Sequence, residues 1–86
     1  MKKNILVIED EVTHSDFMKY ALEKIGYEVT VAADIKKAKK ILLKQGFFVV
    51  FLDLTLTDGE GFRILEFITL KRIDTAVIIL SASKDL

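Results

Sequence analysis

The sequence predicts an α/β domain in which helices cover a parallel sheet. Four short apolar segments alternate along the chain with three segments whose apolar residues recur at helical spacing. Strands that alternate with helices favour parallel pairing through right-handed crossovers. In addition, two of the apolar segments run directly into acidic residues, which is where ligand sites form in such sheets.

The first strand and helix are predicted at residues 4–8 and 13–26. The strand segment is a continuous apolar run, as in strands that are covered on both faces. Thr13, with Asp16 three residues later, resembles a capping box, and Gly26 suits the left-handed position that ends a helix. Four apolar residues of the helix fall at helical spacing: Phe17, Ala21, Leu22 and Ile25.

The second strand and helix are predicted at residues 27–33 and 35–46. The strand segment alternates between apolar and polar residues, Asp34 suits an N-cap, and Gly46 suits the end of the helix. One stripe of the helix is apolar, and five lysines lie mostly off it. The stripe consists of Ile35, Ala38, Ile41 and Leu42.

The third strand, at residues 47–54, is again a continuous apolar run, and it contains Asp53 near its end. A loop at 55–61 leads to a helix at 62–72 that carries Phe62, Leu65 and Ile68 at helical spacing. Residues 75–83 are the fourth predicted strand. The order of elements is therefore βαβαβαβ, within one domain spanning residues 1–86.

Composition excludes several classes of protein. The chain has 86 residues, of which 51% are hydrophobic, so one folded domain is expected. Thirteen basic residues balance thirteen acidic ones, which gives no reason to expect nucleic acid or an anionic membrane as a partner. There is no cysteine for a disulfide or a thiolate metal site, and no apolar run approaches the ~20 residues of a membrane span. We expect a cytoplasmic protein.

Acidic residues follow two of the predicted strands. Glu9 and Asp10 follow the first, and Asp53 ends the third. If these strands are neighbours, the carboxylates converge at the carboxyl edge of the sheet, where their mutual repulsion is costly. A hard divalent cation such as Mg²⁺ relieves that repulsion. A single acid after a strand is often only a loop residue or a helix cap, but two strands that end this way favour a site.

Other polar residues near this edge are less informative. Ser81 lies at the end of the fourth predicted strand and could place a hydroxyl near a bound phosphate, although serine is common in such turns. His14 is the only histidine, and an exposed helix residue is the simplest interpretation. Lysines 36, 37, 39, 40 and 44 are interpreted as a solvated helix face, because aromatic interleaving and net positive charge are lacking. No glycine-rich nucleotide-binding loop is present.

Three stretches together, "ILVIEDE", "FLDLTLTDGEGF" and "IILSAS", resemble the receiver domain of two-component response regulators, a CheY-like superfamily. The resemblance covers the whole chain in order, and the spacings from Asp10 to Asp53 and from Asp53 to Ser81 suit that family. It implies a flavodoxin-like, doubly wound sheet with strand order 2-1-3-4.

The resemblance also implies roles for individual residues. Asp53 would be the phosphoacceptor, and Ser81 the switch hydroxyl that hydrogen-bonds the phosphoryl group. Asp10 would bind Mg²⁺ directly, Glu9 mostly through water, and Thr55 through its backbone carbonyl. Gly61 would match the glycine of the loop after the third strand. The phosphoryl donor would be a histidine kinase or a phosphotransfer protein, and the domain would catalyse its own phosphorylation and slow hydrolysis while acting mainly as a switch.

Two features depart from the family pattern. Thr57 stands where a proline is usual, which mainly loosens a turn. The family also continues with a helix, a fifth strand ending in lysine and a last helix, none of which these 86 residues contain. Lys84 does not match that lysine. We therefore expect a C-terminally truncated receiver whose fourth strand is an open apolar edge. That edge is expected to be covered in a homo-oligomer, through the strand or through swapped elements, or else the chain is a fragment of a longer protein.

Two further functions compete with the phospho-receiver. The first is a non-phosphorylated, truncated receiver that acts as a self-associating interaction module. The second is a small Mg²⁺-dependent phosphohydrolase on a similar fold. An enzyme of that kind commonly carries an acid/base aspartate two residues after the nucleophile, and Thr55 at this position disfavours it.

Overall fold

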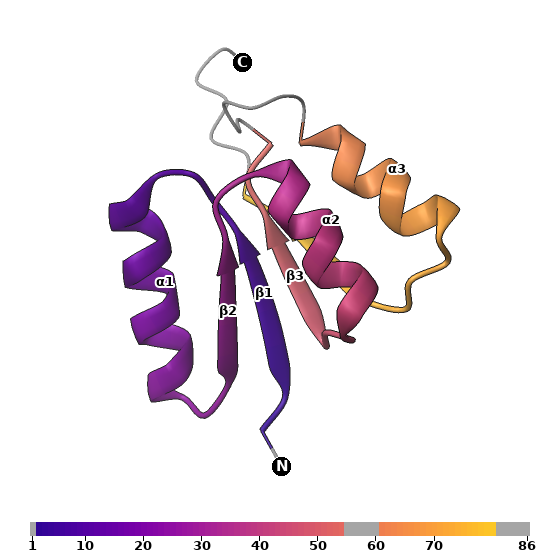
Figure 1. The fold of residues 1–86 in the computed structure, drawn as a ribbon. Coiled ribbons are helices and arrows are strands. Elements are labelled where there is room, and N and C mark those ends of the chain that lie inside the picture. Colours follow the sequence, from indigo (N-terminus) through magenta and orange to yellow (C-terminus); the bar gives the residue numbers. More distant parts are fainter. Residues whose placement is uncertain (1, 55–60, 81–86) are drawn as a thin grey trace.

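The computed structural model describes residues 2–54 and 61–80. The elements in chain order are β1 (Asn4–Ile8), α1 (Val12–Lys24), β2 (Glu28–Ala32), α2 (Ile35–Lys44), β3 (Val49–Leu52), α3 (Phe62–Leu70) and β4 (Ala76–Ile79). All neighbouring strands are parallel and follow the order β2-β1-β3-β4 (Figure 1). This confirms the predicted α/β class and strand order. Across the described residues the sheet has no fifth strand.

The helices cover both faces of the sheet, so each face has its own core. In Figure 1, α2 and α3 lie together on one side, and α1 lies apart from them. The larger core lies under α2 and α3, and the smaller core lies under α1, where Met18 and Leu22 pack against the sheet. Buried members of the larger core are Leu6, Ile8, Ala32, Ile35, Ala38, Leu42, Phe47, Val50, Leu52, Ile64 and Ile68.

The continuous apolar run of β1 follows from its place between the two cores. Leu6 and Ile8 belong to the larger core, and Ile5 and Val7 belong to the smaller one, as the two-residue period of a strand requires. Leu6, Val7 and Ile8 are fully buried. Full burial of each such side chain stabilises the fold by roughly 1.5–3 kcal/mol, so β1 is a major source of stability.

The start of α1 differs from the prediction. The helix begins at Val12, and its N-cap is Glu11 rather than Thr13. The Glu11 carboxylate accepts hydrogen bonds from the backbone N–H groups of Thr13, at 3.2 Å, and His14, at 3.1 Å. The predicted capping box at Thr13 and Asp16 was therefore wrong. Thr13 already lies in the first turn, and the Glu11 carboxylate takes the N–H groups at the second and third helical positions that an N-cap usually bonds.

The side of α1 that packs against the sheet differs from the apolar side predicted from residue spacing. Phe17 and Ile25 are 70% and 71% exposed, whereas Met18 and Leu22, four residues apart, face the sheet. The predicted end of the helix is confirmed. Gly26 has φ +104°, and the N–H groups of Gly26 and Tyr27 donate to the carbonyls of Glu23 and Leu22, which is a Schellman motif.

The second helix follows its prediction closely. Asp34 caps α2, since its Oδ1 accepts a hydrogen bond of 2.7 Å from the Lys37 N–H. Ile35, Ala38 and Leu42 are buried against the sheet. The five lysines of α2 lie on its outer side, and Lys39 alone among them is half-buried.

β4 lies at the edge of the sheet, and β3 is its one neighbour among the described residues. Ile78 and Ile79 are each 45% exposed. Because successive strand residues point to opposite faces, both faces of β4 expose apolar surface. The predicted open apolar edge is therefore present in the part of the chain that the structure describes.

Candidate functional site

The carboxyl ends of β1 and β3 are joined directly. Ile8 pairs with Leu52 in the sheet register, and the Asp53 N–H donates to the Ile8 carbonyl at 3.1 Å. On the other side of β1, the Glu9 N–H donates to the Ala32 carbonyl at 3.0 Å. These ladder bonds fix the backbone on which the acidic side chains stand.

Three acids meet at this edge, as the strand order required. One carboxylate oxygen from each of Glu9, Asp10 and Asp53 lies within 4.8 Å of the others. Glu9 and Asp53 are only 5% and 8% exposed, and Asp10 is half-buried. Buried carboxylates this close repel one another strongly unless a proton or a cation is shared among them.

The pKa of Glu9 reflects its burial and its acidic neighbour. Burial raises the pKa of the Glu9 carboxyl above its ordinary value of 4.5, and the hydrogen bond and negative charge of Asp53 raise it further. The Glu11 N–H, which donates to Glu9 Oε2 at 3.2 Å, and the nearby His14 lower that pKa. A Glu9–Asp53 hydrogen bond between two carboxyl groups requires a shared proton, which a bound cation would replace.

Glu11 and His14 form an outer layer around Glu9. His14 is 68% exposed at its side chain, yet its Nδ1 lies 3.5 Å from Glu9 Oε1 and its Nε2 lies 3.5 Å from Glu11 Oε2. The sequence alone indicates only an exposed helix residue for His14 and no role at the site for Glu11. The one sequence signal for this layer is the spacing of Glu11 and His14, three residues apart at a helix start.

The start of α3 is held against the end of β3. A Cβ atom on Gly61 would lie 2.7 Å from Leu54 Cα and 3.0 Å from the Asp53 carbonyl oxygen. Real Cβ atoms do not approach backbone atoms this closely, so glycine is required here for steric reasons. The predicted family glycine therefore has a physical reason, which is the close approach of two backbone segments beside Asp53.

Three sequence predictions fall where the structure makes no statement. Thr55, Thr57 and Ser81 lie outside the described residues. Among the described residues, Glu9, Asp10 and Asp53 offer only oxygen atoms as ligands, which suits a hard cation. Mg²⁺ takes a few carboxylates and keeps several waters, which fits an acidic cluster at a sheet edge better than it fits an enclosed cage.

Comparisons with known proteins match this arrangement over nearly the whole chain. The chain is 33% identical over 79 residues to the two-component response regulator ARR11 of Arabidopsis thaliana, covering 90% of this chain and 15% of that protein. It is 33% identical over 84 residues to the probable transcriptional regulator ycf27 of Cyanophora paradoxa, covering 98% of this chain and 35% of that one. The chain thus spans about a third or less of the length of these relatives.

A solved structure gives the same result for the fold. The response regulator TrrA from Thermotoga maritima, in complex with Mg²⁺-BeF, superposes with a TM-score of 0.88 at 30% identity, over 98% of this chain and 72% of that one. No described helix is long and apolar enough to cross a membrane. The family profile of the response regulator receiver domain matches residues 5–86. With its sheet order, its acidic edge and these matches, the chain belongs to the response regulator receiver domain family.

Proposed function

We propose that the chain is a phospho-receiver of two-component signal transduction, in which Asp53 accepts a phosphoryl group from a histidine kinase or a phosphotransfer protein. The observation that carries this proposal is the meeting of Glu9, Asp10 and Asp53 within 4.8 Å at the carboxyl edge of the sheet. The similar protein TrrA was solved in complex with Mg²⁺-BeF, which supports a cation at the equivalent edge.

The chain's own residues supply the positions that the reaction needs. An Asp53 carboxylate oxygen attacks the phosphorus of a phosphohistidine, and the P–N bond breaks. The electron pair of that bond returns to the imidazole nitrogen, which takes up a proton. The hydrogen bond from the Asp53 N–H to the Ile8 carbonyl holds the Asp53 backbone at the carboxyl edge of the sheet during the attack. Mg²⁺, held by Glu9, Asp10, Asp53 and the Thr55 carbonyl, would neutralise charge on the transferred group.

The other parts of the proposal rest on the family resemblance. Ser81 is proposed to hydrogen-bond the phosphoryl group and so to report phosphorylation to a protein-binding surface. The proposal also includes a receiver domain spanning residues 1–86, as the resemblance implies, and a cytoplasmic location, which rests on the composition. None of these parts rests on a contact among the described residues.

Labelling with acetyl phosphate tests the proposal. We expect Mg²⁺-dependent phosphorylation of the 86-residue chain, detected by intact-mass spectrometry, that disappears in Asp53→Ala and falls strongly in Asp10→Asn. The labelling should be weak, because the family's lysine is not among these residues. Asp74→Asn is the matched control, since this exposed acid precedes β4 and therefore lies at the amino-terminal ends of the strands, away from the acidic cluster. Labelling that survives in Asp53→Ala would overturn the assignment.

A second candidate, a self-associating interaction module, is favoured by one specific observation. Apolar surface is exposed on β4, where Ile78 and Ile79 are each 45% exposed, and on α1, where Phe17 and Tyr20 are 70% and 63% exposed. We propose that copies of the 86-residue chain associate through β4 or by exchange of elements. Exposed strand edges pair readily, and burial of these side chains removes apolar area from water.

Sedimentation equilibrium of the same 86-residue chain tests this second candidate. We expect a dimer or a larger species that Ile78→Lys dissociates, whereas Leu43→Lys, at a 62% exposed position on α2, leaves it intact. Association that is identical with and without Mg²⁺ would favour an interaction module over a phosphorylation switch. A monomer at high concentration contradicts self-association and leaves the phospho-receiver proposal unaffected.

A further inference from the structure

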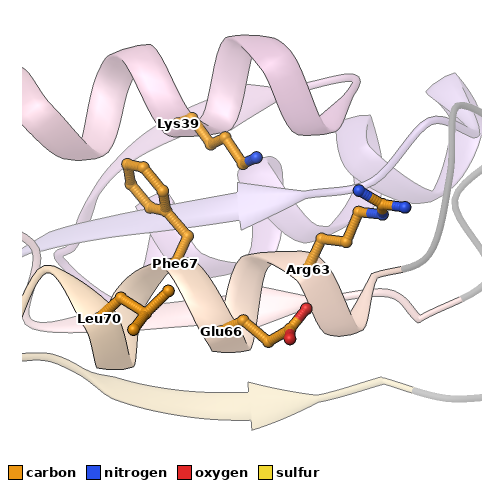
Figure 2. A pocket seen from close by; sticks show the side chains of 5 residues that line it. All are labelled: Lys39, Arg63, Glu66, Phe67 and Leu70. Carbon is orange, nitrogen blue, oxygen red and sulfur yellow. The ribbon is translucent and has the colours of Figure 1, made fainter.

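A groove between α2 and α3 lies outside the acidic edge. It has a volume of about 190 Å³ and is lined by Lys39 of α2 and by Arg63, Glu66, Phe67 and Leu70 of α3. Figure 2 shows the charged ends of Lys39, Arg63 and Glu66 extending toward the same end of the groove, with the Phe67 ring and Leu70 toward the other. The groove therefore has a charged end, with two cations and one carboxylate, and an apolar end.

The side chains at the apolar end are available for contact. Leu70 is 81% exposed, so its side chain is open to a partner. Phe67 is half-buried and presents part of its ring, with Lys39 Nζ 5.5 Å from the ring centroid. This distance allows a cation–π attraction, which positions the Lys39 ammonium over the groove.

The two cations at the charged end exceed the single carboxylate there. Neither Lys39 nor Arg63 forms an ion pair there, although Glu66 lines the same groove. The surrounding field is also positive, because α2 carries five lysines and no acid. The chain as a whole has no net charge. A basic face on a neutral chain means that positive and negative residues are unevenly distributed over the surface.

These observations select the chemistry of an occupant. A volume of about 190 Å³ is below the roughly 300–1,000 Å³ of small-molecule sites, and it suits one inserted side chain of a protein partner. A phosphate backbone carries a charge on every nucleotide and so meets Glu66, whereas a helix can place its carboxylates away from that residue, which disfavours nucleic acid. A helix with one apolar stripe flanked by carboxylates matches both ends of the groove.

We propose that the groove formed by Lys39, Arg63, Glu66, Phe67 and Leu70 docks an acidic amphipathic helix of a partner protein. An apolar side chain of the partner packs against Phe67 and Leu70, and its carboxylates pair with Lys39 and Arg63. Glu66 limits binding to partners whose acids avoid the centre of the groove, which gives the surface specificity beyond general charge attraction.

A designed peptide serves as the probe for this proposal. It is a synthetic helix with leucine at every third or fourth position and glutamate elsewhere. Titration into the ¹⁵N-labelled 86-residue chain should shift the amide signals of the groove residues and those of their neighbours on α3. Two comparison peptides separate the contributions: one replaces each leucine by glutamine, and one replaces each glutamate by lysine. Both should bind at least about tenfold more weakly.

Variants on the exposed surface locate the binding site. Lys39→Glu combined with Arg63→Glu should weaken the peptide about tenfold, and Leu70→Ser should weaken it without changing the charge. Lys36→Glu combined with Lys44→Glu is the matched control, because it makes the same charge change on α2 outside the groove. The dispersion of the amide spectrum checks that each variant is folded, and exposed Leu70 makes unfolding of Leu70→Ser unexpected.

Two results would overturn the docking proposal. In the first, the control pair weakens the peptide as much as the groove pair does, which would make the attraction a general property of the lysine face. In the second, a single-stranded oligonucleotide binds more tightly than the peptide and Leu70→Ser has no effect on either, which would identify a nucleic-acid surface instead. Neither result bears on labelling of Asp53.

Discussion

Glu11 has two functions at the point where β1 leads into α1. Its N–H donates to the Glu9 carboxylate, and its own carboxylate accepts from Thr13 and His14. One residue therefore caps the helix and orients an acid of the site. The bond to Glu9 comes from the Glu11 backbone, so substitution of the side chain removes the cap and the contact with His14 Nε2 but leaves this bond in place.

Replacement of Glu11 by alanine should lower the free energy of unfolding by about 1 kcal/mol, which is the usual value of a lost N-cap. Urea denaturation of the 86-residue chain measures this difference. Glu23→Ala is the control, since Glu23 is an exposed acid of the same helix and caps nothing. Equal losses in the two variants would show that the Glu11 cap contributes nothing particular to stability.

Glu9 should make the stability of the metal-free protein depend on pH. Its pKa is raised on folding, so the folded chain binds this proton more readily than the unfolded chain does. The resulting stabilisation is fully present below the ordinary value of 4.5 and is lost as pH rises through the raised folded pKa. Stability from this group therefore falls between acidic and neutral pH.

The measurement is the unfolding free energy of the wild type and of Glu9→Gln from about pH 4 to pH 8 without divalent ions. The difference between the two proteins isolates Glu9 from the other carboxylates. As pH rises, the unfolding free energy of the wild type should fall relative to that of Glu9→Gln. A difference that stays constant across this range would contradict the shared proton.

At the scale of elements, the contact between α3 and the end of β3 depends on one glycine. Gly61→Ala places a methyl group 2.7 Å from Leu54 Cα, and overpacking of this kind costs about 1–3 kcal/mol. Thermal or urea unfolding should show that loss. Gly46→Ala is the matched control, because its added methyl group meets no atom within 4 Å and its φ is not positive. We expect that variant to be neutral or slightly stabilised.

The elements that the sequence predicted well are those whose burial is uniform. β1 lies between two cores, so its apolar run identifies it without reference to the rest of the fold. The meeting of Glu9, Asp10 and Asp53 was also predictable, because the chain order of parallel strands fixes which ends share an edge.

The features that failed depend on side-chain reach and on small rotations. Glu11 and Thr13 both carry oxygen acceptors and stand within one turn of each other, so either could cap the helix. The sequence does not show at which residue the helix begins, and the cap is Glu11 rather than Thr13. Adjacent helix residues point about a quarter-turn apart, so Phe17 and Met18 cannot be assigned to the packed side by apolar character alone. The approach of His14 to Glu9 depends on a rotamer and has no sequence pattern beyond its spacing from Glu11.

At the scale of the whole molecule, the repulsion among the three acids lowers the stability of the folded chain, and a bound cation should restore that stability. A ligand that binds only the folded state stabilises it by about 2.7 kcal/mol at about 100 times its Kd. Mg²⁺ should therefore raise the midpoint of thermal unfolding at neutral pH. Asp10→Asn should remove most of this gain, and Asp74→Asn should retain it. An equal Mg²⁺ effect in both variants would indicate general salt screening in place of a site.

The tight approach of Gly61 to Leu54 has a mechanical consequence for the molecule. A Cβ atom on residue 61 would meet backbone atoms and not the end of a flexible side chain, so the neighbouring atoms could make room only if the chain itself shifted. Any larger residue at this position would therefore displace the start of α3 or the backbone beside Asp53. The absence of one methyl group thus sets where the proposed phosphoacceptor stands relative to a whole helix.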